Sequence, residues 1–222
     1  MVLLAGCTLA RRPSARYTRA LPFVELAFDD PVPSIATLSR WSRDLPKSLV
    51  RAIVAPRSAV VSPRGPLRRD PALDRSVRWW LDAASTLGAQ ALVLATPTDL
   101  SPGPRDREVL RSYLASVVPA DPTVWVAWQP AGVWTGDETI EEAARNGVVP
   151  IVDPIEDDVP PATRGYARIG SLGARPRLTP TLLEQIVETY SAHELALVAL
   201  RTDQAFAEAR ALDALARSVQ AP

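Results

Sequence analysis

The chain has 222 residues, of which 47% are hydrophobic and 23% are charged. This composition is typical of a folded globular protein and excludes a wholly disordered chain. The length predicts one domain that spans residues 1–222. The 25 basic and 25 acidic residues cancel, so no net charge draws the protein towards nucleic acid or an anionic membrane.

Cysteine and histidine are almost absent, and this restricts the chemistry. Cys7 is the only cysteine and His193 the only histidine. A disulfide within the chain and a metal site built from cysteines are therefore excluded. We expect His193 at the surface, remote from any site, which leaves no base for a serine or cysteine nucleophile. We expect neither a metal nor a cofactor.

The first residues have two interpretations. Leu4-Ala5-Gly6-Cys7 resembles a bacterial lipoprotein cleavage site, but no basic segment precedes it. The apolar run is also shorter than the ~7–15 residues of a signal sequence. A buried first strand is the favoured interpretation, and no apolar run approaches the ~18–20 residues of a membrane span. We therefore expect a cytoplasmic protein without a membrane partner.

Short apolar runs recur along the chain, each of a length typical of a strand. Several of them lack polar alternation, as strands buried on both faces do. In chain order they are Val2–Gly6, Phe23–Phe28, Val50–Ala55, Ala91–Ala95, Val124–Trp128, Val148–Val152, Tyr166–Ile169 and Leu195–Leu200.

Most of the intervening segments have apolar residues at helical spacing. The link between the sixth and seventh runs is rich in Pro and Asp and is expected to lack a full helix. The expected helices are Ile35–Arg43, Ala72–Leu87, Arg105–Val117, Thr139–Arg145, Pro180–Tyr190 and Asp203–Val219.

Strands that alternate with helices predict a parallel sheet with right-handed crossovers. About eight such units favour an α/β fold of the (β/α)8 type, a TIM-like barrel. Since such barrels usually need ~250 residues, this one must be compact, with room for one incomplete β/α unit. An open doubly wound sheet is the alternative, but Gly6-Cys7-Thr8 is not the glycine-rich turn that a nucleotide-binding sheet has after its first strand.

Several short motifs resemble those of the YecE-like family (domain of unknown function seventy-two), in the same order and nearly from end to end. The resemblance implies a barrel similar to the (β/α)8 type, in a family without a general assigned reaction. The motifs are Leu4–Thr8, Tyr17–Pro31, Trp41 with Leu45-Pro46, Leu87-Gly88 with Thr96-Pro97, Trp134, Val152–Pro154 and Tyr166–Arg168.

The polar motifs of that family are largely replaced. The family's Glu-x-Arg-His corresponds to Trp128-Gln129-Pro130-Ala131, and its Arg-x-His-Gly corresponds to Arg168-Ile169-Gly170-Ser171. Its Asn-Asn-Asp near the last strand corresponds to Arg201-Thr202-Asp203. The resemblance therefore implies a degenerate member that keeps the scaffold. The polar residues retained are Glu25, Asp153, Arg168 and Asp203.

Sites in barrels form where the loops after the strands converge. The residues at these ends mix carboxylates with arginines, which suits a small anionic or sugar-like ligand. The alternative is that they are loop residues that pair with one another. They are Cys7, Asp29, Arg57, Asp99, Gln129, Asp153, Ser171, Arg201 and Asp203.

Glu25 lies within an expected strand, between apolar residues. A carboxylate inside a barrel must be paired or protonated, because burying it alone costs several kcal/mol, roughly. Arg168 on another strand is the expected partner. The pair is either a general acid with an anion anchor or a structural ion pair.

Two other groups each have a functional and a structural interpretation. Trp128 and Trp134 could stack on a sugar at the mouth, although core packing is favoured. Asp153 with the acidic residues 156–158 could attract Mg²⁺ or Ca²⁺, although the spacing is not that of an EF-hand and a solvated loop is favoured.

Three functions remain open. The first is a non-catalytic or small-ligand-binding barrel of pseudoenzyme type, which binds through Glu25, Asp29, Arg57, Trp128, Gln129, Asp153, Arg168, Arg201 and Asp203. The second is a hydrolase-like enzyme centred on Glu25 and Asp153, with a divalent metal as an option. The third is an adaptor that binds nucleic acid or protein through the arginine-rich segment 51–78. Nucleic acid is the less favoured partner, because that segment lacks interleaved aromatic residues.

Overall fold

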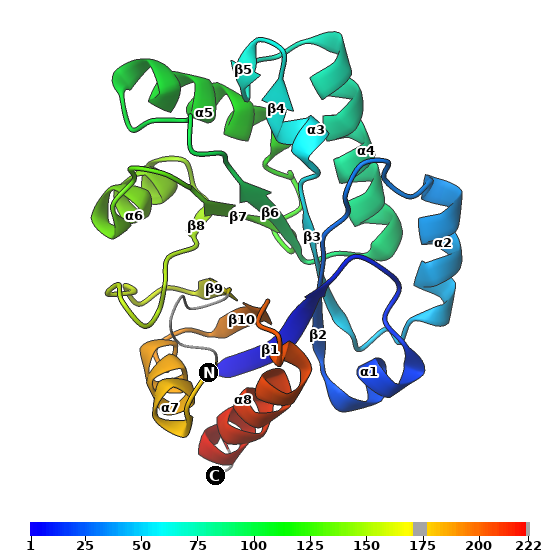
Figure 1. Ribbon diagram of the computed structural model, residues 1–222, viewed down its shortest axis with the longest axis vertical. Helices are drawn as coiled ribbons and strands as arrows, with labels where there is room; N and C mark the ends of the chain where they lie inside the picture. The colour runs from blue at the N-terminus through cyan, green and yellow to red at the C-terminus, as the bar shows by residue number, and fades with distance from the viewer. Residues whose placement is uncertain (171–176, 221–222) are drawn as a thin grey trace.

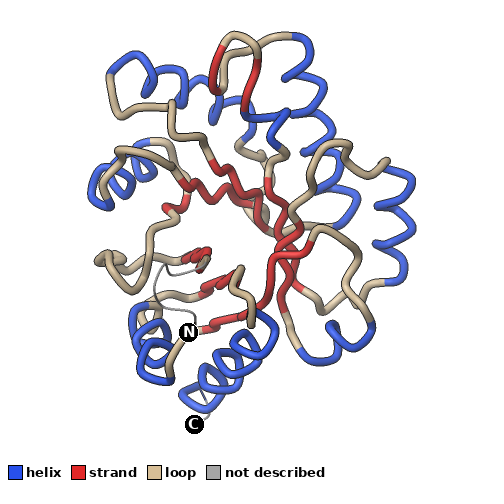
Figure 2. The backbone as a smooth tube through the Cα atoms, in the orientation of Figure 1, coloured by secondary structure: helices blue, strands red, loops and turns tan. Residues whose placement is uncertain are grey.

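The computed structural model describes residues 1–170 and 177–220 of the chain. In this part, strands form an inner ring and helices lie outside it (Figures 1 and 2). The predicted (β/α)8-type barrel is thus confirmed as a nearly closed barrel of eight parallel strands.

The sheet has the strand order β8-β7-β6-β3-β2-β1-β10-β9, and every neighbouring pair is parallel. A small antiparallel hairpin, β4 with β5, lies apart from it. The strands are β1 (Val2–Leu9), β2 (Phe23–Leu26), β3 (Val50–Val54), β4 (Val61–Ser62), β5 (Gly65–Pro66), β6 (Ala91–Ala95), β7 (Trp125–Gln129), β8 (Val149–Pro150), β9 (Arg164–Ile169) and β10 (Leu195–Leu200).

The helices begin where their sequences supply caps. Ser34 and Thr179 each accept a hydrogen bond from a backbone N–H in the first turn, and Thr135 forms a capping box with Glu138. The helices are α1 (Ala15–Ala20), α2 (Ile35–Asp44), α3 (Arg57–Val60), α4 (Pro71–Leu87), α5 (Pro104–Val117), α6 (Gly136–Arg145), α7 (Pro180–Thr189) and α8 (Ala205–Gln220).

The alternation of side chains along each strand divides the core into two layers. Phe23, Tyr166 and Leu197 belong to a cluster inside the barrel. Val24, Trp128 and Val198 belong to a larger cluster between the sheet and the helices. Along each strand, side chains therefore point alternately to the barrel interior and to the helices.

One β/α unit is incomplete, as the sequence predicted. No helix occurs between β8 and β9, where the chain runs through turns over residues 151–163. No ladder joins β8 to β9 among the described residues, so the ring has a seam at this unit. None of the helices in the described part of the chain is both long and apolar enough to cross a membrane.

Candidate functional site

A buried carboxylate organises the interior of the barrel. Glu25 on β2 has no exposed surface. Its Oε1 accepts a hydrogen bond from Thr8 Oγ1 at 2.7 Å, and its Oε2 accepts one from Tyr166 Oη at 2.8 Å. These donors come from β1 and β9, so three strands converge on one carboxylate.

Arg168 on β9 neutralises this carboxylate. Its Nε lies 2.9 Å from Glu25 Oε2 and 3.1 Å from Oε1, and its side chain is only 4% exposed. The predicted pair of Glu25 and Arg168 is thus present. Because its donors engage both carboxylate oxygens, Glu25 is stabilised as an anion in a medium where an unpaired charge would be costly.

The charge of Glu25 also affects the pKa of the Tyr166 phenol. Burial raises the pKa of its phenol well above the usual value, and the neighbouring Glu25 raises it further. The phenol therefore stays protonated and acts as a hydrogen-bond donor to Glu25.

Arg168 also reaches towards β7. Its Nη1 donates a hydrogen bond to Gln129 Oε1 at 2.6 Å. The carboxamide nitrogen of Gln129 is consequently turned away from Arg168. Glu25, Arg168 and Gln129 form a continuous polar chain from β2 across β9 to β7.

This chain ends at a small polar pocket of about 210 Å³ at the carboxyl ends of β7 and β8. We call it the mouth pocket. Glu25 is not among its lining residues and connects to it only through Arg168. The lining residues are Gln129, Pro130, Trp134, Thr135, Gly136, Thr139, Ile151, Val152, Asp153, Asp157 and Arg168.

Two aspartates also line this pocket. Asp153 Oδ1 accepts the N–H of Ile155 at 2.9 Å, and the Asp153 N–H donates to Asp157 Oδ2 at 2.9 Å. A Cβ at Gly136 would lie 2.5 Å from Asp157 Oδ1, so the absence of a side chain there makes room for this carboxylate. Among the described residues, no three His, Cys, Asp or Glu side chains are grouped closely enough to hold a metal ion.

The favoured interpretation of Trp128, core packing, is confirmed, so Trp128 does not itself line the mouth. Trp128 is fully buried in the layer between sheet and helices, where its Nε1 donates to Thr96 Oγ1 at 3.2 Å. The strand alternation places Gln129 on the interior face instead. Trp128 does pack edge-to-face against Trp134, with ring centroids 5.0 Å apart, and Trp134 lines the mouth pocket.

The other described residues expected at the strand ends are not among those that line the mouth pocket. Cys7 is buried in β1, in the layer that faces the helices. Ser171 falls outside the described residues. The remaining five are exposed in or next to the loops after the strands: Asp29, Arg57, Asp99, Arg201 and Asp203.

The arginine-rich segment 51–78 is partly neutralised. Arg51 is buried and donates to the carbonyl oxygens of Leu87 and Pro46. Arg68 pairs with Asp106 at 3.3 Å, and Arg69 pairs with Asp74. These contacts stabilise the fold and reduce the free positive charge of the segment.

The expectation that His193 lies at the surface is wrong. Its side chain is 3% exposed and packs against the Tyr190 ring, with centroids 5.0 Å apart. Burial lowers its pKa below the usual value, because the charged imidazolium is disfavoured there.

Solved structures with this architecture include DUF72 family proteins. One from Thermotoga maritima aligns with a TM-score of 0.69 over 99% of each chain, at 14% sequence identity. Another from Enterococcus faecalis aligns with a TM-score of 0.67 over 98% of this chain and 95% of that one, at 11% identity. This chain has the DUF72 fold. The fold expected from the resemblance to the YecE-like family is confirmed.

A wider group of barrels shares the architecture. A xylose isomerase domain containing protein from Salmonella typhimurium aligns with a TM-score of 0.56 over 88% of this chain and 86% of that one, at 13% identity. At these identities the likeness extends to the fold alone. No family model matches the sequence, and no curated protein matches it.

Several site residues were not predicted from the sequence. Thr8 and Tyr166 are ordinary residues for strands, and nothing local marks them as partners of Glu25. Asp157 was seen only as part of an acidic loop. Thr8 and Tyr166 could have been predicted from an alignment of the eight strands by their apolar alternation, because it would have shown that both side chains face the barrel interior.

Proposed function

We propose that the protein is a non-catalytic barrel that binds a small, polyhydroxylated, sugar-like molecule in the mouth pocket. The observation that carries this proposal is the composition of the pocket. One arginine already paired with Glu25, one carboxamide, two carboxylates and one indole surround about 210 Å³. A lining that offers both donors and acceptors suits hydroxyl groups, which both donate and accept hydrogen bonds.

The charges of the pocket favour a neutral ligand over an anion. Glu25 neutralises Arg168, while Asp153 and Asp157 add negative charge to the lining of the pocket. A phosphate or carboxylate would be repelled by these aspartates. A sugar can instead donate hydroxyl protons to them and accept from Arg168 and the Gln129 amide, with Trp134 as an apolar wall.

In this proposal Glu25 has a positioning role. Hydrogen bonds from Thr8, Tyr166 and Arg168 occupy its oxygens, and a guanidinium held on two sides keeps a fixed orientation. The protein is then a divergent relative of the DUF72 proteins. It keeps the fold and has lost most of the polar residues of the YecE-like motifs. The shared fold and the matching chain lengths support this kinship.

Saturation-transfer NMR with D-xylose and D-glucose tests the proposal. We expect transfer to at least one of the two sugars from the wild type, and loss of transfer in Asp153→Asn and Gln129→Leu. The control is Asp158→Asn, which removes an exposed carboxylate of the same loop that does not line the pocket. Equal transfer in all variants, or none in the wild type, would refute the proposal.

A hydrolase is the second candidate, favoured only by the proximity of Asp153 and Asp157. Such an enzyme would use these two carboxylates, since Glu25 reaches the pocket only through Arg168. Hydrolysis of 4-nitrophenyl xyloside or glucoside that is lost in Asp157→Asn would favour the hydrolase. Sugar binding without turnover favours the non-catalytic barrel.

A further inference from the structure

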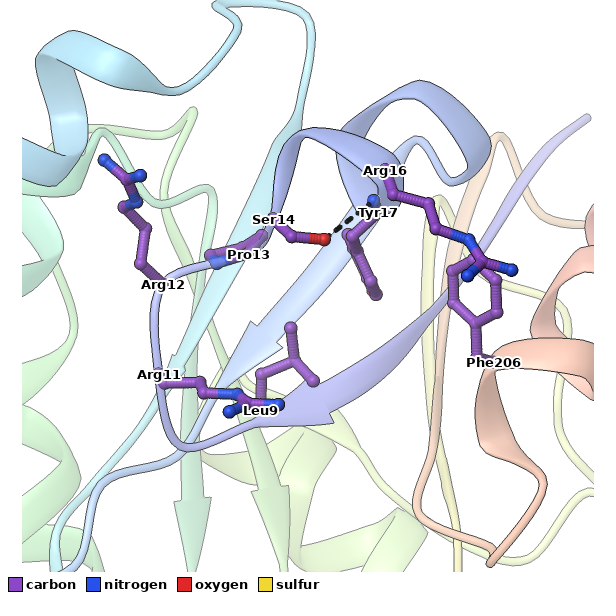
Figure 3. Close-up of a pocket in the computed structure, with 8 residues that line it drawn as sticks. All are labelled: Leu9, Arg11, Arg12, Pro13, Ser14, Arg16, Tyr17 and Phe206. Carbon is purple, nitrogen blue, oxygen red and sulfur yellow. Dashed lines mark hydrogen bonds between the residues drawn. The ribbon is translucent and has the colours of Figure 1, made fainter.

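A second hollow lies outside the barrel, between the loop after β1 and the start of α8 (Figure 3). We call it the arginine cleft. Its volume is about 630 Å³, within the ~300–1,000 Å³ range of small-molecule sites. Its lining residues are Leu9, Arg11, Arg12, Pro13, Ser14, Arg16, Tyr17 and Phe206.

The cleft is at the face of the barrel where sites form. Leu9 is the last residue of β1, and Phe206 is in the first turn of α8, which follows the last strand, β10. In barrels of this type, loops at the carboxyl ends of the strands build the ligand sites, and phosphate groups often bind near the last β/α units.

In the described part of the chain, an ion pair offsets the charge of only one of the three cleft arginines. Arg12 pairs with Asp44. Within residues 1–170 and 177–220, Arg11 and Arg16 have no carboxylate at ion-pair distance. Arg11 and Arg16 therefore leave positive charge beside the hollow that no described carboxylate pairs with, and an anion bound there would offset it.

The positive charge continues along α1 and α8. An adjoining hollow shares Arg16 and Phe206 with the cleft and adds Arg19, Arg210 and Arg217. Arg217 is paired with Asp213 at 2.6 Å. The other two extend a positive field that would attract an anion towards the cleft.

The walls of the cleft are apolar and ordered. The Tyr17 hydroxyl donates to the carbonyl oxygen of Phe23 at 2.7 Å and accepts the Cys7 N–H at 2.8 Å. Tyr17 therefore presents its ring rather than its hydroxyl group. Leu9 and Pro13 add aliphatic surface, so the cleft can hold an apolar body beside a charged group.

We propose that the arginine cleft binds an organic phosphate with at least two negative charges attached to a flat or apolar body. Arg11 and Arg16 bind the phosphate groups, and the body lies against Leu9 and Pro13. This site is separate from the mouth pocket, with which it shares no lining residue.

A single-stranded nucleic acid is the less suitable occupant. Base recognition without sequence preference uses open aromatic faces for stacking. Here Arg16 lies over the Phe206 ring, 5.8 Å from its centroid, and the Tyr17 ring is 5.9 Å from the same ring. Phe206 therefore already has partners, and the cleft suits a compact ligand.

Calorimetric titration at low ionic strength tests the proposal with three probes: ADP, inorganic pyrophosphate and adenosine. The double variant Arg11→Ser/Arg16→Ser removes two unpaired guanidinium groups. The control Arg75→Ser/Arg78→Ser removes the same charge from exposed positions of α4. We expect the wild type and the control to bind ADP, and the cleft variant to lose at least about tenfold in affinity.

The three probes distinguish the contribution of the phosphate charge to binding from that of the apolar body. We expect pyrophosphate to bind more weakly than ADP, and adenosine not to bind. Equal ADP affinity in both double variants, or no binding of ADP and pyrophosphate to the wild type, would overturn the proposal. Displacement of ADP by oligothymidylate, with an affinity that rises with oligonucleotide length, would assign the surface to nucleic acid and overturn it as well.

Discussion

Glu25 is a charge in the interior of a barrel, and its neighbours determine whether the barrel is stable. Thr8, Tyr166 and Arg168 supply the hydrogen bonds and the positive charge that water would supply outside. Such a pair contributes little compared with a well-packed apolar core, but breaking it leaves an uncompensated buried charge.

We expect Glu25→Gln to lower the free energy of unfolding by about 3–5 kcal/mol, because Arg168 would then be buried without a counter-charge. Urea denaturation of the wild type and the variant measures this loss. The double variant Glu25→Gln/Arg168→Met should recover part of it, since it removes the orphaned charge.

The control for this prediction is Glu108→Gln. Glu108 pairs with Arg111 on the surface of α5, where both side chains are more than 60% exposed, so the loss should stay below about 1 kcal/mol. A Glu25→Gln protein as stable as this control would contradict the structural role of the pair.

His193 predicts a dependence of stability on pH. Burial lowers its pKa in the folded protein, so the unfolded chain binds a proton that the folded protein does not, at pH values below about 6.5. The free energy of unfolding should therefore fall as the pH falls from about 7 to about 5.

The variant His193→Phe keeps an aromatic ring against Tyr190 and removes the titration. Chemical denaturation at several pH values measures the free energy of unfolding of both proteins. We expect this free energy to fall more for the wild type than for the variant as the pH falls. A constant difference across this range would contradict the prediction. All other titrating groups are common to both proteins, so their contributions cancel.

At the scale of single residues, the sequence predicted those contacts that follow from a strong energetic demand. Glu25 needs a partner because it lies between Val24 and Leu26, and Arg168 was predicted as that partner. His193 was placed wrongly and Trp128 was left with two interpretations, because their burial depends on the packing of Tyr190 and on the phase of β7. Neither can be read from neighbouring residues.

At the scale of elements, β1 and β2 approach closely at Gly6. Gly6 on β1 pairs in register with Phe23 on β2, and a Cβ at Gly6 would overlap the carbonyl oxygen of Phe23. These two strands can therefore lie in this register only with a glycine at position 6.

We expect Gly6→Ala to destabilise the protein by at least about 3 kcal/mol, because β1 and β2 must separate to admit the methyl group. Thermal or urea unfolding measures the loss. The matched control is Gly170→Ala, where an added Cβ has no neighbour within 4 Å among the described residues, and a change of less than about 0.5 kcal/mol is expected there. Similar stability of the two variants would contradict this close packing of β1 on β2.

All eight barrel strands were predicted from their apolar runs, because a strand buried on both faces has few polar residues. The runs of β6 and β10 match to the residue. β8 is shorter than its run, at Val149–Pro150, since Pro150 has no N–H for a ladder. The helix α1 and the β4–β5 hairpin were missed because elements this short lack a measurable periodicity.

For the whole molecule, the seam between β8 and β9 is where the barrel is least constrained. β1 and β10 lie inside the sheet, while β8 has one sheet neighbour and spans two residues. Local opening should therefore begin at the mouth pocket, which lies beside this seam.

Hydrogen exchange followed by mass spectrometry tests this gradient. We expect the amides of residues 3–7 and 196–200 to exchange more slowly than those of residues 149–152 by at least about tenfold, because opening at an edge costs less free energy than opening at the centre. Equal protection of these segments would contradict the seam.

The alternation of strands and helices predicted the barrel, and the Pro- and Asp-rich link predicted its incomplete unit. The position of the mouth pocket was not predictable in detail. It depends on which residue of β7 faces inward and on a Gly136 that makes room for Asp157. Both are consequences of packing across the whole ring.

The central claim is that Glu25 holds Arg168 and Gln129 at a pocket that binds a sugar-like molecule, and an NMR titration tests it most directly. The Trp134 indole N–H and the Gln129 side-chain amide report on the pocket, while the Trp79 indole, bonded to the carbonyl oxygen of Pro33, reports on a distant contact. On addition of D-xylose, or of D-glucose if it is the sugar that shows transfer, we predict saturable shifts of the Trp134 and Gln129 signals and none of Trp79. These shifts should disappear in Glu25→Gln at a temperature where that variant is folded. Unchanged Trp134 and Gln129 signals in the wild type, or equal shifts in Glu25→Gln, would contradict the claim.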